Sequence, residues 1–320
     1  MAHPPHNLNK YLRPRSNPPA PLYPTRTRPL RYEWEVTLKI TNCGKEEHKS
    51  ALEELDISQR ISRLQSSHQG HRYVRVVKES FGIQGALDEH LCLVYEPLRE
   101  PLWLLGKRLG SSGVPSAVLK PFLNTILLGL DFLHSECRII HTDLKADSFL
   151  VGFETSDVVE AYVRQQEVDP APFKDDGSGG RPVVQSRPDF EPPRKGVGLV
   201  KISDFGASVS GDVTVAYNHD IQPQPFCAPE MMWIFSPPLR QLLDRADPAV
   251  FGRFFHSNGE FKFPDVIPPE GYNLSNLTPF LNSEDKRLFI KLASRMLRWE
   301  PTERATAKEL YDDAWLDFKA

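Results

Sequence analysis

The feature that most constrains this chain is the order of three short motifs. The segment HTDLKADSFL (residues 141–150) comes first, DFG (residues 204–206) follows an apolar run, and APE (residues 228–230) comes last. Each triplet alone arises by chance in many chains, but all three in this order, each in a suitable local context, do so rarely. Apolar runs directly before the first two motifs predict short strands that end in acidic loops. Asp143 and Asp204 lie in these two loops.

The composition excludes some classes of protein. The formal net charge is −3, whereas a general nucleic-acid binder is normally basic, so we expect no direct nucleic-acid partner. The four cysteines are scattered without a CxxC pair, which favours reduced, mostly buried thiols. No apolar run approaches the length of a bilayer, so we expect no membrane partner.

The first thirty residues differ from the rest of the chain. They are basic, lack acidic residues and contain repeated prolines. Without an apolar core this stretch is no secretory signal, and its prolines oppose the amphipathic helix of a mitochondrial presequence. We interpret residues 1–30 as a disordered Pro/Arg-rich tail.

Residues 31–105 have the pattern of a small region of strands with one helix. Apolar and polar side chains alternate in residues 32–40, which predicts a strand. Leucine and isoleucine recur at helical spacing in residues 46–64. Further strands are predicted at residues 72–77 and 91–95, with a loop between them.

Residues 106–320 are predicted to be mainly helical. A broad apolar stripe predicts a long helix over residues 116–134, in which Pro121 should lie in the first turns or cause a kink. Residues 153–197 become acidic and then rich in proline and glycine, so we interpret them as a mobile insertion with little to bury. Residues 284–299 are a further helix candidate. Thr306 and Glu309 have the spacing of a capping box that opens the last helix.

These motifs, in this order, resemble the eukaryotic protein kinase family. Within it, the chain is most similar to the SR-protein kinases (SRPK-like serine/threonine kinases) and their fungal relatives. That closer resemblance depends on Thr142 in place of the usual arginine, on CLVYEPL at residues 92–98, on the insertion before DFG, and on residues 284–316. It covers about residues 31–320 and implies an α+β, bilobal fold, with a partial N-lobe and hinge over residues 31–105 and a C-lobe over residues 106–320.

The resemblance implies a role for each charged residue of the motifs. Asp143 would orient and deprotonate the substrate hydroxyl, Asp204 would carry Mg²⁺, and Lys145 would reach the γ-phosphate of ATP. Lys39 would hold the α- and β-phosphates, and Glu54 would pair with Lys39. Phosphoryl transfer needs this combination because its transition state is stabilised by positioning and charge rather than by covalent chemistry.

The resemblance also implies an adenine site and a structural ion pair. Tyr95 would be the gatekeeper, the Glu96 carbonyl and the Leu98 backbone would bond adenine, and Leu150 would form the floor of the adenine site. Glu230 would form a buried ion pair with Arg304.

The chain departs from the family pattern at three places. No glycine precedes Gly44, so the glycine-rich loop that covers the phosphates is missing. Ser148 replaces the asparagine that helps to hold a Mg²⁺, and a hydroxyl is a poorer metal ligand than an amide oxygen. After Glu230 no long central helix is recognisable. The expected fold is therefore a kinase with an incomplete N-lobe and a C-lobe that lacks the central helix region.

Simpler interpretations of the same residues remain open. Asp143 and Asp204 are also suited to capping loops, because aspartate is common in turns. Lys39 could be a solvated strand-end lysine, and Glu54 an exposed helix glutamate, with Glu53 as the alternative partner of Lys39. His141 is expected to be a packed scaffold residue rather than an acid or base.

The function that these expectations favour is ATP- and Mg²⁺-dependent phosphorylation of serine or threonine in proteins, with Arg/Ser-rich splicing-factor segments as the implied substrates. The alternatives are a degenerate pseudokinase that acts as a binding scaffold, and a truncated product without function. Thiol usage and the resemblance favour a cytoplasmic or nuclear location. The oligomeric state is unknown.

Overall fold

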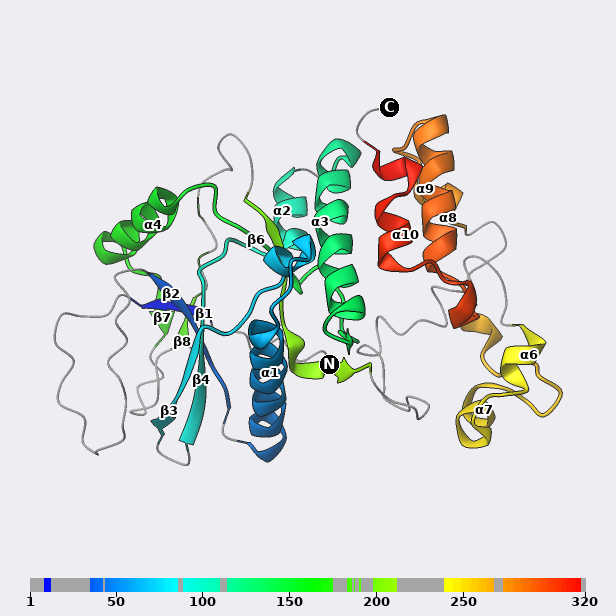
Figure 1. Ribbon diagram of the computed structural model, residues 1–320, viewed down its shortest axis with the longest axis horizontal. Helices are drawn as coiled ribbons and strands as arrows, with labels where there is room; N and C mark the ends of the chain where they lie inside the picture. Colours follow the sequence, from blue (N-terminus) through cyan, green and yellow to red (C-terminus); the bar gives the residue numbers. More distant parts are fainter. Residues whose placement is uncertain are drawn as a thin grey trace. The chain divides into compact units, whose positions relative to one another are not determined.

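The computed structural model describes residues 9–12, 35–42, 44–85, 89–109, 114–174, 183–185, 187, 190, 198–211, 239–267 and 273–317. The chain divides into two compact units (Figure 1). The first unit contains Met1–Arg108 and Phe132–Asp212, and the second contains Leu109–Asp131 and Val213–Ala320. The predicted lobe boundary at residue 105 stays a prediction.

A four-stranded antiparallel sheet is the main β-structure of the first unit. Its strands are β1 (Asn9–Leu12), β2 (Val36–Ile40), β3 (Glu79–Gln84) and β4 (Glu89–Tyr95), in the order β1-β2-β4-β3. Leu38, Leu93 and Val94 are buried on the two central strands. The alternation in β2 and the apolar run in β4 thus form strands where the sequence predicts them.

Two predictions about this sheet are corrected. Residues 9–12 of the N-terminal tail pair with β2 as a strand. No strand forms at residues 72–77. The 3-10 helix η1 (Gln69–Tyr73), whose N-cap His68 accepts a hydrogen bond from the amide of Gly70, extends into this stretch, and an isolated bridge joins Val74 to Ile202. The strand after it is β3, whose second half falls in the predicted loop.

Helix α1 (Lys45–Arg63) confirms the prediction for residues 46–64. Acidic residues in its first turn and arginines in its last turn complement the helix dipole. Its buried face consists of Ala51, Glu54, Ile57, Ser58 and Ile61. In Figure 1 the helix runs beside β4, and residues of the two elements are in contact. One carboxylate is thereby buried among apolar neighbours.

Two short antiparallel pairs frame the acidic loops. β5 (Ile139–Ile140) pairs with β10 (Val209–Ser210), and β6 (Phe149–Val151) pairs with β9 (Val200–Ile202). The loop with Asp143 runs from β5 to β6, and Asp204 follows β9 directly before the 3-10 helix η2 (Phe205–Ala207). The strands predicted before the first two motifs are therefore present.

Gly152 and Gly198 allow the β6–β9 pair to close tightly. A Cβ atom on Gly198 would lie 2.5 Å from the backbone of Gly152, which no larger residue tolerates. The close approach joins the start of the insertion to its end.

The insertion contains a helix that the sequence analysis missed. Helix α4 (Ser156–Val168) buries Val158, Val159 and Tyr162, and the Tyr162 ring lies 4.5 Å from that of Phe190. The short strands β7 (Phe173–Lys174) and β8 (Val183–Val184) pair after it. The expectation that residues 153–197 have little to bury is therefore corrected, because their scattered apolar side chains meet on one side of the helix.

Buried charges join the start of this insertion to the segment after β4. One guanidinium nitrogen of Arg99, Nη1, donates to both carboxylate oxygens of Glu154 at 2.9 and 2.8 Å. Arg99 also donates to Glu100, which in turn accepts from Arg108 of helix α2 (Leu102–Leu109). Arg99, Glu100 and the Glu154 side chain are all buried. Each charge is thus paired, as buried charges must be.

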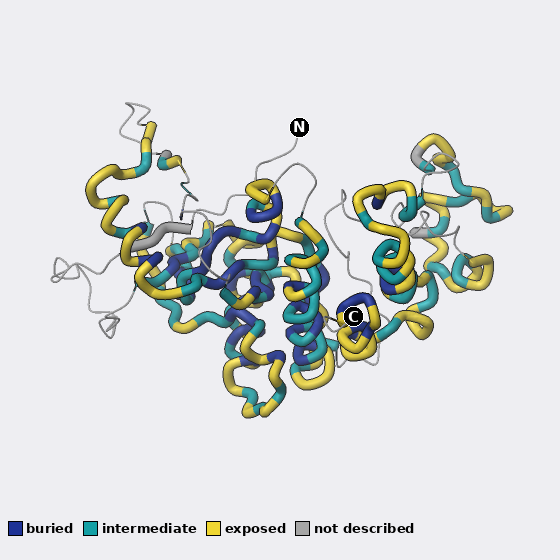
Figure 2. Tube along the Cα trace, turned by 90° about the horizontal axis from the view of Figure 1, so that it is seen from above, coloured by how far each residue is buried: buried dark blue, intermediate teal, exposed yellow. Residues whose placement is uncertain are grey.

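Helix α3 (Ser116–Ser135) agrees with the predicted helix, and Pro121 lies in its first two turns. In the second unit, Leu127 of α3 packs in a core with Leu292, Ala307, Leu310, Trp315 and Leu316. By length and composition α3 could cross a membrane, contrary to the expectation that no apolar run does so. Core helices have the same length and composition, and α3 buries Phe122, Ile126, Leu127, Phe132 and Leu133. Figure 2 colours each described residue by its burial.

The rest of the second unit is helical in its described parts. It contains α6 (Arg240–Leu243), α7 (Pro248–Phe254), α8 (Leu274–Leu277), α9 (Ser283–Met296) and α10 (Ala307–Tyr311). Single-turn 3-10 helices lie at η4 (Pro264–Val266), η5 (Pro301–Glu303) and η6 (Ala314–Leu316). The capping box of Thr306 and Glu309 is confirmed, with both reciprocal hydrogen bonds formed.

Candidate active site

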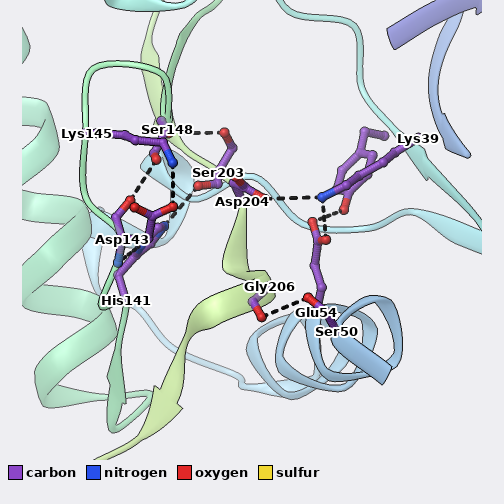
Figure 3. Close-up of polar contacts among 11 residues, drawn as sticks. Lys39, Ser50, Glu54, His141, Asp143, Lys145, Ser148, Ser203, Asp204 and Gly206 are labelled. Atoms are coloured by element: carbon purple, nitrogen blue, oxygen red, sulfur yellow. Dashed lines mark hydrogen bonds and ion pairs between the residues drawn. The ribbon is translucent and has the colours of Figure 1, made fainter. Parts of the chain in front are cut away.

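Three charged groups from separate elements meet in the first unit (Figure 3). The ammonium of Lys39 on β2 lies 2.6 Å from Oε2 of Glu54 on α1 and 3.2 Å from Oδ1 of Asp204. Burial opposes the charge on Lys39, but the carboxylates of Glu54 and Asp204 outweigh it and raise its pKa. Burial also opposes the charge on Asp204, and Lys39 outweighs it, with help from Lys145 and His141, so that the pKa of Asp204 is lowered. Lys39 and Asp204 are therefore both charged at neutral pH.

The structure decides between the two glutamates that the sequence offers as partners of Lys39. Glu54 is buried at 4% exposure, and its carboxylate contacts Lys39. Glu53 is exposed and pairs with Lys49 one turn earlier on the same helix. The interpretation of Lys39 as a solvated lysine and Glu54 as an exposed glutamate is therefore excluded.

The loop between β5 and β6 presents a third carboxylate, that of Asp143. Oδ2 of Asp143 accepts a hydrogen bond from the ammonium of Lys145 at 2.6 Å. Oδ1 of Asp143 is buried and has no hydrogen-bond partner among the described residues. A buried carboxylate oxygen without a donor is unfavourable unless the site receives one from outside. Asp143 is therefore arranged to accept a hydrogen bond from a bound group.

His141 holds this loop in place through both of its ring nitrogens. Its Nε2 lies 2.9 Å from the carbonyl of Ser203, and its Nδ1 lies 3.4 Å from the amide nitrogen of Asp143. These partners assign the proton to Nε2, which donates to the carbonyl, while Nδ1 accepts. Burial lowers the pKa of His141 despite the nearby Asp204 and Asp143. The predicted scaffold role for His141 agrees with these contacts.

Ser148 ties the two acidic loops together. Its hydroxyl donates to the carbonyl of Asp143 at 2.9 Å, and its own carbonyl accepts from both the amide and the hydroxyl of Ser203 at 2.8 and 3.1 Å. Because Ser203 precedes Asp204, these bonds fix the Asp143 loop to the Asp204 segment. The hydroxyl oxygen of Ser148 keeps its lone pairs for a cation.

Backbone strain also marks this region. Thr142 and Asp204 have φ values of 60° and 70°, which are uncommon for residues other than glycine. The Thr142 hydroxyl donates to the carbonyl of Ala207 at 2.5 Å, and the hydroxyl of Ser208 donates to the carbonyl of His141 at 3.2 Å. These two bonds offset the strain by joining the loops.

The residues implied for the adenine site lie in and after β4. Tyr95 and Leu98 are buried, and Leu150 is half-buried in β6. The carbonyl of Glu96 accepts a hydrogen bond from Nη2 of Arg75 at 2.9 Å, and its carboxylate pairs with Lys201 at 2.6 Å. One lone pair of the Glu96 carbonyl is thus already used, and the second remains for a ligand.

Sequence reasoning missed Arg75 and Lys201, since neither lies in a recognised motif. Glu230 lies outside the described residues. The guanidinium of Arg304 donates to the carbonyls of Arg298 and Trp299. The tail that stands in place of the glycine-rich loop is described only at residues 9–12. After Glu230 the structure describes residues 239–267, where the helices α6 and α7 are short.

The comparison with family models places this site in context. A protein kinase domain model matches residues 33–244, which is more than half of the chain. The chain belongs to the protein kinase family. The predicted α+β kinase fold is thereby confirmed, and the enzyme class is that of phosphotransferases acting on proteins.

Individual relatives agree with the closer resemblance. A serine/threonine protein kinase of Aspergillus fumigatus is 30% identical over 310 residues, covering 82% of this chain and 74% of the relative. The serine/threonine-protein kinase SRPK of Physarum polycephalum is 25% identical over 350 residues, covering 88% and 79%. Protein kinase dsk1 of Schizosaccharomyces pombe is 34% identical over 116 residues, covering 36% and 21%. The resemblance to SRPK-like serine/threonine kinases is confirmed.

The kinase family uses ATP and Mg²⁺, and the donor set at the site fits them. Asp204 keeps its negative charge, as a Mg²⁺ ligand must, and hydroxyl and carboxylate oxygens are the ligands that Mg²⁺ prefers. Lys39 and Lys145 supply positive charge on either side of Asp204 (Figure 3). The site therefore has the charges that a metal–triphosphate requires.

Proposed function

We propose that this chain transfers the γ-phosphate of ATP to serine or threonine hydroxyls in Arg/Ser-rich protein segments. The observation that carries the proposal is the pairing of Lys39 with both Glu54 and Asp204, next to a loop in which Asp143 keeps one carboxylate oxygen unbonded among the described residues. A degenerate site would not need a half-buried lysine held between two carboxylates. The Arg/Ser-rich substrate class follows from the likeness to SRPK-type kinases.

Each residue has a distinct part in this mechanism. Oδ1 of Asp143 accepts the proton of the substrate hydroxyl, while Lys145 holds Oδ2 and so fixes the plane of the carboxylate. Lys39, positioned by Glu54, binds the α- and β-phosphates. Asp204 and the Ser148 hydroxyl would hold Mg²⁺, and the ion would neutralise phosphate charge. Lys145 lies beside Asp143 and neutralises charge that develops on the transferred group.

The adenine base of ATP would bind to the segment that follows β4. The second lone pair of the Glu96 carbonyl and the backbone of Leu98 bond the base, and Leu150 packs beneath it. Arg75 and Lys201 hold Glu96 in place from two sides. We further propose that the chain works in the cytoplasm or the nucleus.

The test is radiolabel transfer from ATP to an Arg/Ser-repeat peptide. We expect transfer by the wild type and loss of at least about 100-fold in Asp143→Asn, because the proton acceptor is removed. Asp147→Asn is the matched control: it changes an exposed aspartate of the same loop and should leave transfer unchanged. Equal transfer to a Gly/Ser-repeat peptide would reject the substrate class.

The alternatives give different results in the same experiment. A pseudokinase would gain thermal stability from Mg²⁺–ATP but transfer no phosphate. A chain without function would show neither effect. Transfer that is equally strong in Asp143→Asn would refute the assigned role of Asp143.

A further inference from the structure

Both oxygens of the Glu54 carboxylate are held by side chains from the sheet. Oε2 lies 2.6 Å from the ammonium of Lys39 on β2, and Oε1 accepts a hydrogen bond from the hydroxyl of Tyr95 at the end of β4, also at 2.6 Å. Glu54 and Tyr95 are only 4% and 5% exposed. A buried carboxylate is stable only when donors satisfy its oxygens. Two donors from two strands fix its position and the orientation of its plane.

The hydroxyl of Tyr95 serves this purpose because it stays protonated. Burial raises the pKa of Tyr95, and the negative charge of Glu54 raises it further. Neutral phenol in contact with a carboxylate interacts favourably only by donating its proton. The bond is charge-assisted, which makes it stronger than a bond between neutral groups.

The ring of Tyr95 is itself held in place. The guanidinium of Arg75 lies 4.4 Å from the ring centroid, and the same side chain donates to the carbonyl of the next residue, Glu96. Across the sheet, Tyr95 pairs in register with Thr37, two residues before Lys39 on β2. Side chains two apart on a strand share a face, so Thr37, Lys39 and Tyr95 all lie on the side of the sheet that meets α1.

We propose that Tyr95 is a positioning residue for phosphoryl transfer, acting through Glu54 on Lys39. This role belongs to its hydroxyl and is separate from any role of its ring at the adenine site. The proposal rests on the proposed function.

The physical reason is a competition for Lys39. Its ammonium already lies 3.2 Å from Oδ1 of Asp204. When the Tyr95 hydroxyl is absent, the Glu54 carboxylate is free to turn, and it holds Lys39 less firmly. Lys39 then moves toward Asp204 and no longer contacts the phosphates. It also neutralises the negative charge with which Asp204 would bind a cation.

The first experiment is a double-mutant cycle in the full chain with Tyr95→Phe, Glu54→Gln and the double variant. Tyr95→Phe should lower kcat/KM for ATP roughly 10- to 100-fold, as expected for a lost hydrogen bond to a charged group. KM for the peptide should not change. The double variant should be no worse than Glu54→Gln, because the hydroxyl acts only through that carboxylate.

Tyr162→Phe is the matched control. Tyr162 is also buried, and its hydroxyl donates to the backbone carbonyl of Arg187 in the insertion at 2.8 Å. It should leave kcat/KM within about twofold of the wild type. Wild-type activity in Tyr95→Phe, or effects of the two single variants that multiply in the double variant, would overturn the proposal.

A second measurement does not depend on how well Tyr95→Phe folds. Placing 3-fluorotyrosine at position 95 keeps the ring and the hydroxyl but makes the hydroxyl more acidic. We expect a change of at least about twofold in kcat/KM for ATP, since hydrogen-bond strength follows donor acidity. The same replacement at position 162 should have no effect. A result of no change at position 95 would argue for packing alone.

Failure of the proposed function gives a distinct result. If the wild type transfers no phosphate but binds Mg²⁺–ATP in calorimetry, the proposed function fails. The positioning role then predicts about tenfold weaker ATP binding in Tyr95→Phe, and equal binding overturns it. If the wild type binds no nucleotide, both are overturned.

Discussion

Arg99 and Glu154 form a buried ion pair in which one guanidinium nitrogen serves both carboxylate oxygens, at 2.9 and 2.8 Å. Arg99 follows the adenine-site segment in sequence, and its amide donates to the carbonyl of Val151 on β6. Glu154 begins the insertion. The pair therefore connects the insertion to the backbone next to the proposed nucleotide site.

Glu154→Gln should destabilise the protein by about 3 kcal/mol, because it leaves the Arg99 guanidinium buried with less negative charge around it. The control is Glu160→Gln, which changes an exposed glutamate of helix α4 that pairs with Arg164 at 3.6 Å. That change should cost less than about 0.5 kcal/mol. Urea unfolding measures both, and equal costs would show that the ion pair adds no stability.

Asp204→Asn should lower phosphoryl transfer by at least about 100-fold, because a neutral amide replaces the charge that holds Mg²⁺. Lys39 would keep its bond to Glu54, so the fold should persist. Asp169→Asn, at an exposed ion pair with Arg187 in the insertion, is the control and should transfer at the wild-type rate. Transfer by Asp204→Asn within threefold of the wild type would contradict the metal role.

The free energy of unfolding should decrease when the pH is lowered through about 6.5, the ordinary pKa of histidine, because of His141. Burial lowers the pKa of His141 in the folded state, so the unfolded chain takes up a proton first. The contribution of His141 is therefore complete above this pH and is lost below it. Asp143 and Asp204 face the ring, and the lowered pKa of Asp204 keeps that carboxylate charged throughout this window.

His141→Gln should show a smaller loss of stability between about pH 7 and pH 5, since its amide cannot be protonated while it can still donate to Ser203. Urea unfolding at each pH measures the difference. Parallel curves for the two proteins would rule out His141 as the source of the pH dependence.

Thr306→Ala should destabilise the second unit by about 1 kcal/mol, because it removes the hydroxyl that caps α10. The Glu309 carboxylate would lose its bond to that hydroxyl but keep the one to the Thr306 amide. Thr302→Ala, at an exposed position just before, should have no measurable effect. Identical unfolding midpoints for the two variants would count against the cap.

The charged part of the site could be predicted from the sequence, because each residue lies in a motif with a local structural signature. Lys39 lies near the end of an alternating strand, and Asp143 and Asp204 follow apolar runs. The choice of Glu54 over Glu53 needed the structure, since it depends on how helix α1 is rotated against the sheet.

Other contacts could not be predicted because they join segments distant in sequence. The Tyr95 hydroxyl reaches Glu54 across 41 positions, and Arg75 reaches Glu96 across 21. Helix α4 was missed because the proline and glycine residues later in the insertion dominated the composition of the whole insertion. The buried face of α4 also depends on a distant partner, since Tyr162 packs against Phe190. The strand was predicted too early, at residues 72–77 instead of β3. The backbone of Val74 and Arg75 forms its hydrogen bonds with η1 and with Ile202 of β9, and not within the sheet.

The pairing of β1 with β2 has a practical consequence for work with shortened versions of the protein. A chain that starts after Leu12 leaves the amides and carbonyls of β2 without the partners that β1 supplies along that side. An exposed edge strand of this kind can pair with a strand of another chain. Recombinant protein that lacks its first twelve residues should therefore self-associate on concentration, and light scattering of the two lengths would reveal it.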